Sequence, residues 1–332
     1  METSRRLRWR WGINRWIVLG LMIFTVIAVN VIAAPVQPTI TVAAEKIIEQ
    51  PLVTLPFLGP IYLTDSLTAT LLVDLVVLGI AFAVRQATRK GDLVPTGFSG
   101  AVEAGIEMMY NLTESTAGKY AKKIFPWFAS ILIFVLVANL IKLLPGFESI
   151  GLLYPASGGG NTIQAIGGGW FNLLPVKAAG DQAYVLHPFL RGLSTDLNFT
   201  LALALTAVVM IQVVGVQTQG FRYFSKFLNF TTMFKKPIFG FMDFIVGILE
   251  AISELAKILS FAFRLFGNMF AGFVMIALVG AMLPVFMPAM IFMFEFFIGA
   301  IQAFVFGMLT LVFMTQATHG HSDESQSETE EH

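Results

Sequence analysis

The sequence predicts an all-α polytopic membrane protein that combines upright transmembrane helices with a hairpin of two long, steeply tilted helices. Its 332 residues are 56% hydrophobic and only 13% charged, whereas soluble domains carry about 25% charged residues. The mean hydropathy is +0.76. Six apolar stretches reach or approach the roughly 20 residues that span a bilayer core. These observations exclude a water-soluble globular protein.

The residue inventory also excludes several classes of function. The 21 Lys and Arg balance 21 Asp and Glu, so the chain has no excess positive charge with which to bind nucleic acid. It has no Cys, which removes disulfides, thiolate catalysis and cysteine-ligated metals. Three of its four His fall in the last fourteen residues. We therefore expect neither a metal nor a cofactor.

The first apolar stretch, residues 16–34, follows five Arg within the first fifteen residues. This pattern predicts an N-terminal signal anchor over residues 1–34. The Arg-rich start and the small residues before Pro35 also suit a cleaved signal peptide, and both interpretations stay open. In either case residues 35–65 form an external segment, because the chain leaves the membrane on its outer side.

Three upright crossings are predicted in the next part of the chain. The second has Lys142 near its outer end, where a long side chain can reach the polar interface. Asp74, Asn139 and Gln212 lie inside the crossings, and we expect them to form structural hydrogen-bond networks between membrane helices. The three crossings cover residues 66–84, 125–144 and 198–216.

The connecting segments differ in composition. Residues 103–123 are polar and helix-forming, which favours an interfacial amphipathic helix. The outer loop 150–197 contains two Gly-Gly-Gly runs but lacks the lysine and the strand–helix setting of a phosphate-binding loop, so we expect a flexible connection. Residues 319–332 are acidic and rich in Ser and Gln, which is typical of a disordered tail, here on the cytoplasmic side.

The last two apolar stretches are too long for upright crossings. Residues 237–283 and 284–316 would form helices of about 70 and 50 Å at about 1.5 Å per residue. A helix of about 50 Å confined to a core of about 30 Å must lean by about 50°, beyond the usual range of about 0–40°. The pattern predicts a steeply tilted hairpin that turns near Pro284 and Pro288 and wraps a curved partner.

The distribution of basic residues predicts the orientation. With the N-terminus inside and six crossings, fifteen of the 21 Lys and Arg lie on the inner side and three on the outer side. Positive charge accumulates in cytoplasmic loops. We therefore expect a multi-pass protein of the cell inner (plasma) membrane with a cytoplasmic C-terminus.

Arg264 and Glu295 are the only charged residues between Ile258 and Gln316. An ionisable side chain at the membrane centre costs about 2.5–3.5 kcal/mol even on the lenient insertion scale, and such residues are functional-site candidates. Arginine does not lose its charge in proteins. A purely structural role is therefore a poor fit for Arg264.

The spacing of the polar residues places them on common helix faces. At about 100° per residue, six residues of the first long helix fall within an arc of about 80°. In the second long helix, Glu295 and Gln302 share a face. If the hairpin turns near residue 285, Gln302 comes within reach of Asn268 or Arg264, and Glu295 lies farther toward the outer end. The six residues of the first helix are Asp243, Glu250, Glu254, Lys257, Arg264 and Asn268.

The segment SFAFRLFGNM at residues 260–269 resembles the signature of subunit a of the bacterial F-type ATP synthase. The run Ile301–Phe306 resembles that family's second motif, and a weaker likeness extends over residues 50–318. Two positions depart from the family pattern. Many bacterial members have a glutamate where this chain has Phe273 and a histidine where it has Glu295, so one acid is kept in an altered geometry.

The resemblance implies an ion-translocating stator subunit of the membrane Fo sector, with a subunit a membrane domain over residues 66–318. Arg264 would be the fixed cation between two half-channels that pass protons to and from the carboxylates of a rotating c-ring. Its other partners would be b-type peripheral stalk subunits, the F1 sector through the complex, and membrane lipid. The chain itself would be non-catalytic, because the nucleotide chemistry would belong to another subunit.

The resemblance also divides the polar side chains between the half-channels. Lys257 is a possible relay but is better interpreted as a snorkelling anchor, since it lies nearer the cytoplasmic boundary. The outer half-channel would contain Glu295, Asn268, Gln302 and Asp196, with His187 as a further candidate. The inner one would contain Glu250, with Glu254 and Asp243 as further candidates.

A different class of function stays open at this point. A secondary transporter could bind an anionic substrate at Arg264, since a permanent cation in the membrane suits such a ligand. Transporters of this kind usually show repeated halves and broken helices, and neither is visible in the sequence.

Overall fold

The computed structural model of the chain falls into two compact units. The smaller unit contains Met1–Ile40, Leu152–His187 and Ala271–Glu295, and the larger contains Thr41–Gly151, Pro188–Phe270 and Phe296–His332. The structure describes residues 11–32, 40–56, 59–88, 97–144, 146–156, 160–178, 182–220, 223, 237–282 and 286–318. The predicted acidic tail, residues 319–332, lies outside the described residues and stays a prediction.

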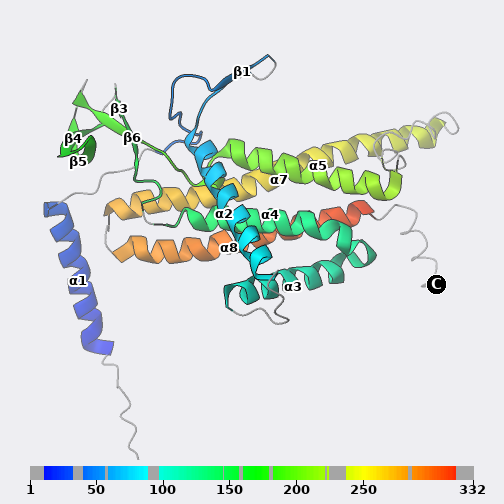
Figure 1. Cartoon of the computed structure of the whole chain (residues 1–332), viewed down its shortest axis with the longest axis horizontal. Helices are drawn as coiled ribbons and strands as arrows, with labels where there is room; N and C mark the ends of the chain where they lie inside the picture. The colour runs from blue at the N-terminus through cyan, green and yellow to red at the C-terminus, as the bar shows by residue number, and fades with distance from the viewer. Residues whose placement is uncertain are drawn as a thin grey trace, which may run out of the picture. The chain divides into compact units, whose positions relative to one another are not determined.

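Five helices within the described residues are long and apolar enough to cross a membrane. This confirms the prediction of a mostly helical, multi-pass membrane protein. The three predicted upright crossings match helices in Figure 1 to within a few residues at most ends. The elements of this part are α2 (Asp65–Thr88), α3 (Phe98–Ala117), the 3₁₀ turn η1 (Gly118–Tyr120), α4 (Ala121–Ile141), the 3₁₀ turn η3 (Leu193–Thr195) and α5 (Leu197–Gln219).

Helix α3 covers most of the segment for which an amphipathic helix is predicted. It ends at Gly118, whose φ of 50° lies in the left-handed region that glycine adopts without a steric penalty. After the short turn η1 the chain continues directly into α4. The helical part of the prediction is therefore confirmed, while the placement of α3 at the membrane interface stays a prediction.

The N-terminal helix α1 covers Trp11–Ile32. Its described apolar stretch, Arg15–Ala28, is shorter than the helices that qualify as crossings. The first crossing, and the choice between an anchor and a cleaved signal peptide, stay predictions. In the larger unit, the predicted external segment forms an antiparallel pair of short strands, β1 (Val53–Leu55) and β2 (Gly59–Ile61).

The two long helices have the predicted lengths. Helix α7 covers Pro237–Met282, with 46 residues, and α8 covers Phe286–Thr318, with 33 residues. At about 1.5 Å per residue they are about 70 and 50 Å long. Pro288 lies in the first turn of α8, where proline fits a helix. Pro284 falls outside the described residues, and the tilt of the pair in a membrane stays a prediction.

The Gly-rich outer loop forms a four-stranded sheet in the smaller unit, so the prediction of a flexible connection was wrong. Strands β4 and β5 pair as an antiparallel hairpin, and its turn contains Gly168 and Gly169, with φ values of 62° and 83°. Such angles need glycine, so these residues serve a tight turn. The strand order is β3-β6-β4-β5. The strands are β3 (Gly151–Pro155), β4 (Gly160–Gly167), β5 (Trp170–Ala178) and β6 (Tyr184–Pro188).

The core of the larger unit lies between its helices. Phe128 and Phe306 are almost fully buried there, and the rings of Phe261 and Phe306 lie 5.1 Å apart between centroids. A Cβ atom at Gly307 would lie 3.1 Å from Cβ of Leu132, so α8 approaches α4 closely at this point. Close packing of this kind, through small residues and van der Waals contact, associates helices in lipid.

Candidate functional site

Arg264 lies on α7 with its side chain exposed. Its Nη2 donates a hydrogen bond to Oγ of Ser260, one turn earlier, at 3.3 Å. Among the residues that the structure describes, no acidic side chain pairs with Arg264. The permanent positive charge therefore points out of the chain's own packing.

The described residues of the chain leave the face of α7 around Arg264 uncovered. Small side chains occupy the strip beside the guanidinium, which permits another helix to approach closely. Large apolar side chains continue the exposed face toward the N-terminal end of α7. The small residues are Ser253, Ala256, Ser260 and Gly267. The large ones include Ile245, Leu249, Ile252, Leu259 and Phe263.

Asn268 and Gln302 join α7 to α8. Nδ2 of Asn268 donates a hydrogen bond to Oε1 of Gln302 at 2.6 Å. Gln302 is buried, with an exposed fraction of 4%. The sequence left open whether Gln302 reaches Asn268 or Arg264, and the contact is with Asn268. The predicted proximity of these two helix positions is therefore confirmed.

Glu295 is the one buried acid on α8 among the described residues, with an exposed fraction of 4%. In the smaller unit its side chain lies against the backbone of α7 at Gly272. A Cβ atom added at Gly272 would collide with Oε1 of Glu295 and lie 3.0 Å from its Cδ. Glu295 can therefore occupy this place only because residue 272 has no side chain. Phe273, at the position where many family members have a glutamate, is partly buried.

Asp196 and His187 have local partners in their own units. Asp196 is buried and is the N-cap of α5, where its Oδ1 accepts a hydrogen bond from the backbone N of Asn198 at 3.0 Å. An aspartate at this position satisfies one of the free N–H groups of the first helical turn. His187, on β6, stacks on Tyr154 with ring centroids 4.6 Å apart. The structure thus gives both residues a structural contact.

The predicted inner group begins with a partly buried ion pair. Nζ of Lys257 lies 3.1 Å from Oε1 of Glu254, three residues earlier on α7. The same Nζ lies 4.8 Å from the ring centroid of Phe313 on α8, which is a cation–π distance. Lys257 thus packs between two helices of the larger unit. Glu250, one turn before Glu254, is partly buried, and the side chain of Asp243 lies outside the described residues.

The network expected of Asn139 is present, whereas Gln212 bonds to a residue just beyond the end of its own helix, so its expected link between membrane helices stays a prediction. Asn139 is fully buried, donates to the backbone O of Gly299 at 3.1 Å and accepts from Oγ of Ser194 at 2.6 Å. Oε1 of Gln212 accepts from the hydroxyl of Tyr223 at 2.6 Å.

For Asp74 the expectation of an internal network was wrong. Its side chain is exposed, and it makes no hydrogen bond within the described part of the chain. The reason is its position around α2, because the packed side of that helix is the side of Ala69 and Val73.

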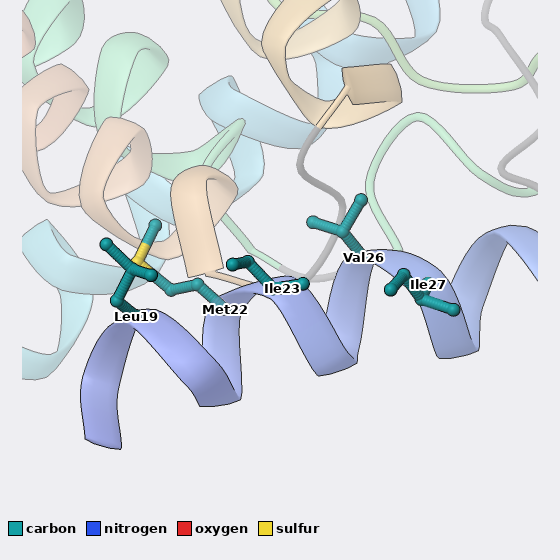
Figure 2. A pocket seen from close by; sticks show the side chains of 5 residues that line it. All are labelled: Leu19, Met22, Ile23, Val26 and Ile27. Carbon is teal, nitrogen blue, oxygen red and sulfur yellow. The ribbon is translucent and has the colours of Figure 1, made fainter. Parts of the chain in front are cut away.

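Two further features bear on whether the chain holds a ligand. Within the described residues, no group of three or more His, Cys, Asp and Glu could hold a metal ion. Figure 2 shows a hollow on the surface of α1 that is lined only by apolar side chains of that one helix. It contains no polar group with which to orient a ligand. Its lining residues are Leu19, Met22, Ile23, Val26 and Ile27.

Comparison with known proteins covers most of the chain. Residues 66–315 match the family model described as ATP synthase A chain. ATP synthase subunit a of Moorella thermoacetica is 26% identical over 264 residues, which cover 80% of this chain and 95% of that protein. The subunit a of Mycobacterium tuberculosis is 29% identical over 269 residues, with coverage of 80% and 90%. That of Aliarcobacter butzleri is 29% identical over 241 residues, with coverage of 72% and 83%.

Proposed function

The chain belongs to the ATP synthase A chain family, and on this basis we propose that it is the ion-translocating stator subunit of the Fo sector. One observation carries the proposal. A permanently charged side chain, Arg264, lies on a face of α7 that the chain's own described residues leave uncovered and unpaired. Because an isolated charge is expensive in lipid, that face suits a partner that brings acidic groups to it.

In this proposal the partner is a ring of c subunits, each with one carboxylate in the membrane. A guanidinium beside a carboxyl group favours the ionised form of that group. A protonated ring carboxyl that arrives at Arg264 therefore releases its proton, and the carboxylate takes up another after it has passed. Since arginine cannot give up its own proton, protons cannot cross at Arg264 itself. Transport then requires rotation of the ring.

Two groups of polar side chains would form the half-channels on either side of Arg264. On the outer side we assign Glu295, the Asn268–Gln302 pair and Asp196, with His187 as a further candidate. On the inner side we assign Glu250, with Glu254, Asp243 and Lys257 as further candidates. Glu295 supports this assignment because it is a buried acid held at a defined place on α7 by Gly272.

The proposal also specifies the membrane, the orientation and the partner subunits of the chain. It would lie in the cell inner (plasma) membrane with its C-terminus in the cytoplasm, as the positive-inside rule indicates. Its partners would be the c-ring, b-type peripheral stalk subunits and, through the complex, the F1 sector. The subunit would be non-catalytic, and ATP would be made elsewhere in the complex. No described feature favours the alternative of a free secondary transporter.

Arg264 substitutions test the proposal in inverted membrane vesicles. Arg264→Ala is expected to abolish ATP synthesis driven by a proton gradient. Arg264→Lys is expected to fail as well, because lysine lacks the planar fork and can lose its charge in apolar surroundings. Ser260→Ala is the matched control, since it removes the hydrogen-bond partner of Arg264 and leaves the guanidinium in place.

Assembly is measured in the same vesicles as the amount of soluble ATPase retained on the membrane. Retained ATPase with no coupled synthesis is the expected result for both Arg264 variants. Coupled synthesis at the unsubstituted rate in either variant would refute the role of Arg264.

A further inference from the structure

The hairpin of β4 and β5 ends in three large apolar side chains that the described residues leave uncovered. They belong to Ile166, Trp170 and Phe171, and each is more than half exposed. The turn between the strands contains Gly168 and Gly169, which have no side chain with which to shield the three. We call these three side chains the apolar tip. Apolar groups that gather on a surface in this way mark an interaction site.

The sequence around the apolar tip carries no charge. Between Glu148 and Lys177 it has no acidic residue, no basic residue and no histidine. Charged residues normally lie at the protein surface, so a surface loop of this length without one is unusual. In the register of the hairpin, Lys177 lies opposite Asn161, at the end away from the turn. The nearest charge is therefore at the base of the hairpin and not at its tip.

The loop that contains the hairpin is anchored on membrane helices of the larger unit. The backbone N of Phe189 donates a hydrogen bond to the backbone O of Ile150 at 2.9 Å, which closes the loop at its two ends. On either side of this closure, Phe147 and Leu193 are buried in one cluster with Ala138 of α4. Because α4 and α5 lie in candidate membrane spans, the loop emerges beside a bilayer surface and stays attached to it.

The hairpin is short enough for its tip to meet that surface. Strand β4 has 8 residues and β5 has 9, so the hairpin is about 30 Å long at about 3.3 Å per residue. At its base, Asn161 pairs with Tyr184 of β6, and β6 ends at Pro188, next to the closure. A tip tethered this closely meets the bilayer at a high effective concentration, which a soluble partner has to match through its own affinity.

The chemistry of the apolar tip favours a membrane–water interface. Tryptophan is enriched at this interface, because its ring is apolar while its N–H can bond to polar groups. The neutral amides Gln164 and Asn172 lie opposite each other just behind the tip and are exposed, which suits the headgroup layer. The two strands pair with each other, so few unpaired backbone groups enter the apolar layer. A lipid surface requires apolar contact without charge, and the tip meets both conditions.

We propose that the apolar tip of the β4–β5 hairpin inserts into the interfacial layer of the bilayer from which its loop emerges. Its ligand is the phospholipid surface, with Trp170 at the level of the headgroups. The hairpin would then give the subunit a hold on the membrane in addition to its helices. The inference is independent of the proposed function, because neither ion transport nor ATP synthesis is its readout.

Fluorescence quenching tests the proposal on the full chain, which has no Cys and can therefore be labelled at one introduced site. Ile166→Cys is labelled with a nitrobenzoxadiazole dye, and the chain is reconstituted in vesicles of phosphatidylcholine and phosphatidylglycerol. Lipids with brominated acyl chains should quench this label strongly. Iodide, present on both sides of the membrane, should quench it at least about fivefold less than a label in water, because an ion is costly to transfer into an apolar layer. The matched control is Val176→Cys, an exposed position near the base of β5, which should behave as a label in water.

Charge substitutions are the second part of the test. With the label at residue 166, Trp170→Asp should abolish quenching by brominated lipid and raise iodide quenching to the value of the base label, because a carboxylate is costly to place in lipid. Val176→Asp adds the same charge at the base and should change neither value. Trp170→Tyr keeps an interfacial aromatic ring and should retain most of the lipid quenching. Since Trp170 and Val176 are both exposed, neither aspartate is expected to unfold the sheet.

Photo-crosslinking in native membranes identifies what the tip contacts in the assembled complex. A benzoylphenylalanine probe in place of Ile166 should attach to phospholipid, and mass spectrometry of the cross-linked peptide detects the adduct. Three outcomes would overturn the proposal. These are attachment of the probe to a protein and not to lipid, equal quenching of the tip and base labels, and an unchanged response to brominated lipid in Trp170→Asp.

Discussion

Asn268 of α7 and Gln302 of α8 are joined by a hydrogen bond of 2.6 Å between their side-chain amides. Gln302 is buried, and its Nε2 makes no hydrogen bond within the described residues. A buried donor of this kind costs about 1–3 kcal/mol when it is left unsatisfied. The bond itself fixes the register of the two long helices at a point one helical turn from Arg264.

Replacement of either amide should destabilise the hairpin, and replacement of both should do so by less than the sum. Interhelical hydrogen bonds in membrane proteins contribute about 0.6 kcal/mol on average and at most about 1.7 kcal/mol. A double-mutant cycle with Asn268→Leu and Gln302→Leu, measured by unfolding of the purified chain in detergent, should give a coupling of that size. Thr310→Val is a control, because among the described residues the hydroxyl of Thr310 bonds only to the backbone O of Phe306 in the same helix. A coupling of zero would contradict the contact.

Gly272→Ala should impair proton flux by displacing Glu295. The added Cβ would occupy the place of the carboxylate, so the acid must turn away from α7. We expect slower proton flux in vesicles and an altered pH dependence, as in Glu295→Gln, which removes the titrating group outright. Gly280→Ala is the matched control on the same helix, because its Cβ would meet only an ordinary contact at 3.6 Å from Pro288. If Gly272→Ala and Glu295→Gln both keep the unsubstituted profile, Glu295 is not on the proton path.

Lys257→Met should destabilise the chain more than Glu254→Gln. The methionine leaves the carboxyl group of Glu254, which is 8% exposed, without the ammonium group of Lys257, and it also removes the contact with Phe313. Breaking a buried pair from one side costs about 3–5 kcal/mol, and partial exposure of Lys257 lowers this figure. The double variant should recover part of the loss. Thermal unfolding in detergent measures the stability of all three variants. Equal unfolding midpoints for the two single variants would contradict a stabilising pair of Lys257 and Glu254.

Substitutions of Asp196 separate its structural role from a role in transport. Asp196→Ala removes the N-cap of α5 and should cost about 1 kcal/mol of stability. Asp196→Asn keeps a side-chain oxygen that can cap the helix but removes the charge, so stability should be nearly unchanged. If Asp196 is also on the proton path, Asp196→Asn alone should slow proton flux. If proton flux falls only in the variant that loses stability, Asp196 acts as a helix cap and is not on the proton path.

The long helices and the contact between them could be predicted because helical geometry is regular. An apolar stretch without an internal proline fixes the length of α7, and a turn near residue 285 fixes which residues of α8 lie opposite Asn268. The pair of Glu254 and Lys257 also had a signal, since residues three apart share a helix face. Asp196 stands just before a helix, which is the usual place of an N-cap.

Other contacts could not be predicted from the sequence pattern. The sheet of residues 151–188 was missed because its glycines suggest flexibility, whereas two of them serve a tight turn. The link from Asn139 to Ser194 and Gly299 joins three elements that lie far apart in the sequence. The contact of Glu295 with Gly272 depends on the rotamer of one side chain and on the absence of another. Neither the Asn139 link nor the contact of Glu295 with Gly272 can be predicted from the helical period.

Helix α7 has a consequence for how the two proposed half-channels are coordinated. Glu250 and Asn268 belong to the same uninterrupted helix of 46 residues, about 27 Å apart along its axis. One inserted residue between them would rotate everything beyond it by about 100°, whereas seven would restore the original angle to within about 20°. The angular phase between the two ends is therefore set by the covalent chain, and no repacking of neighbouring helices can adjust it.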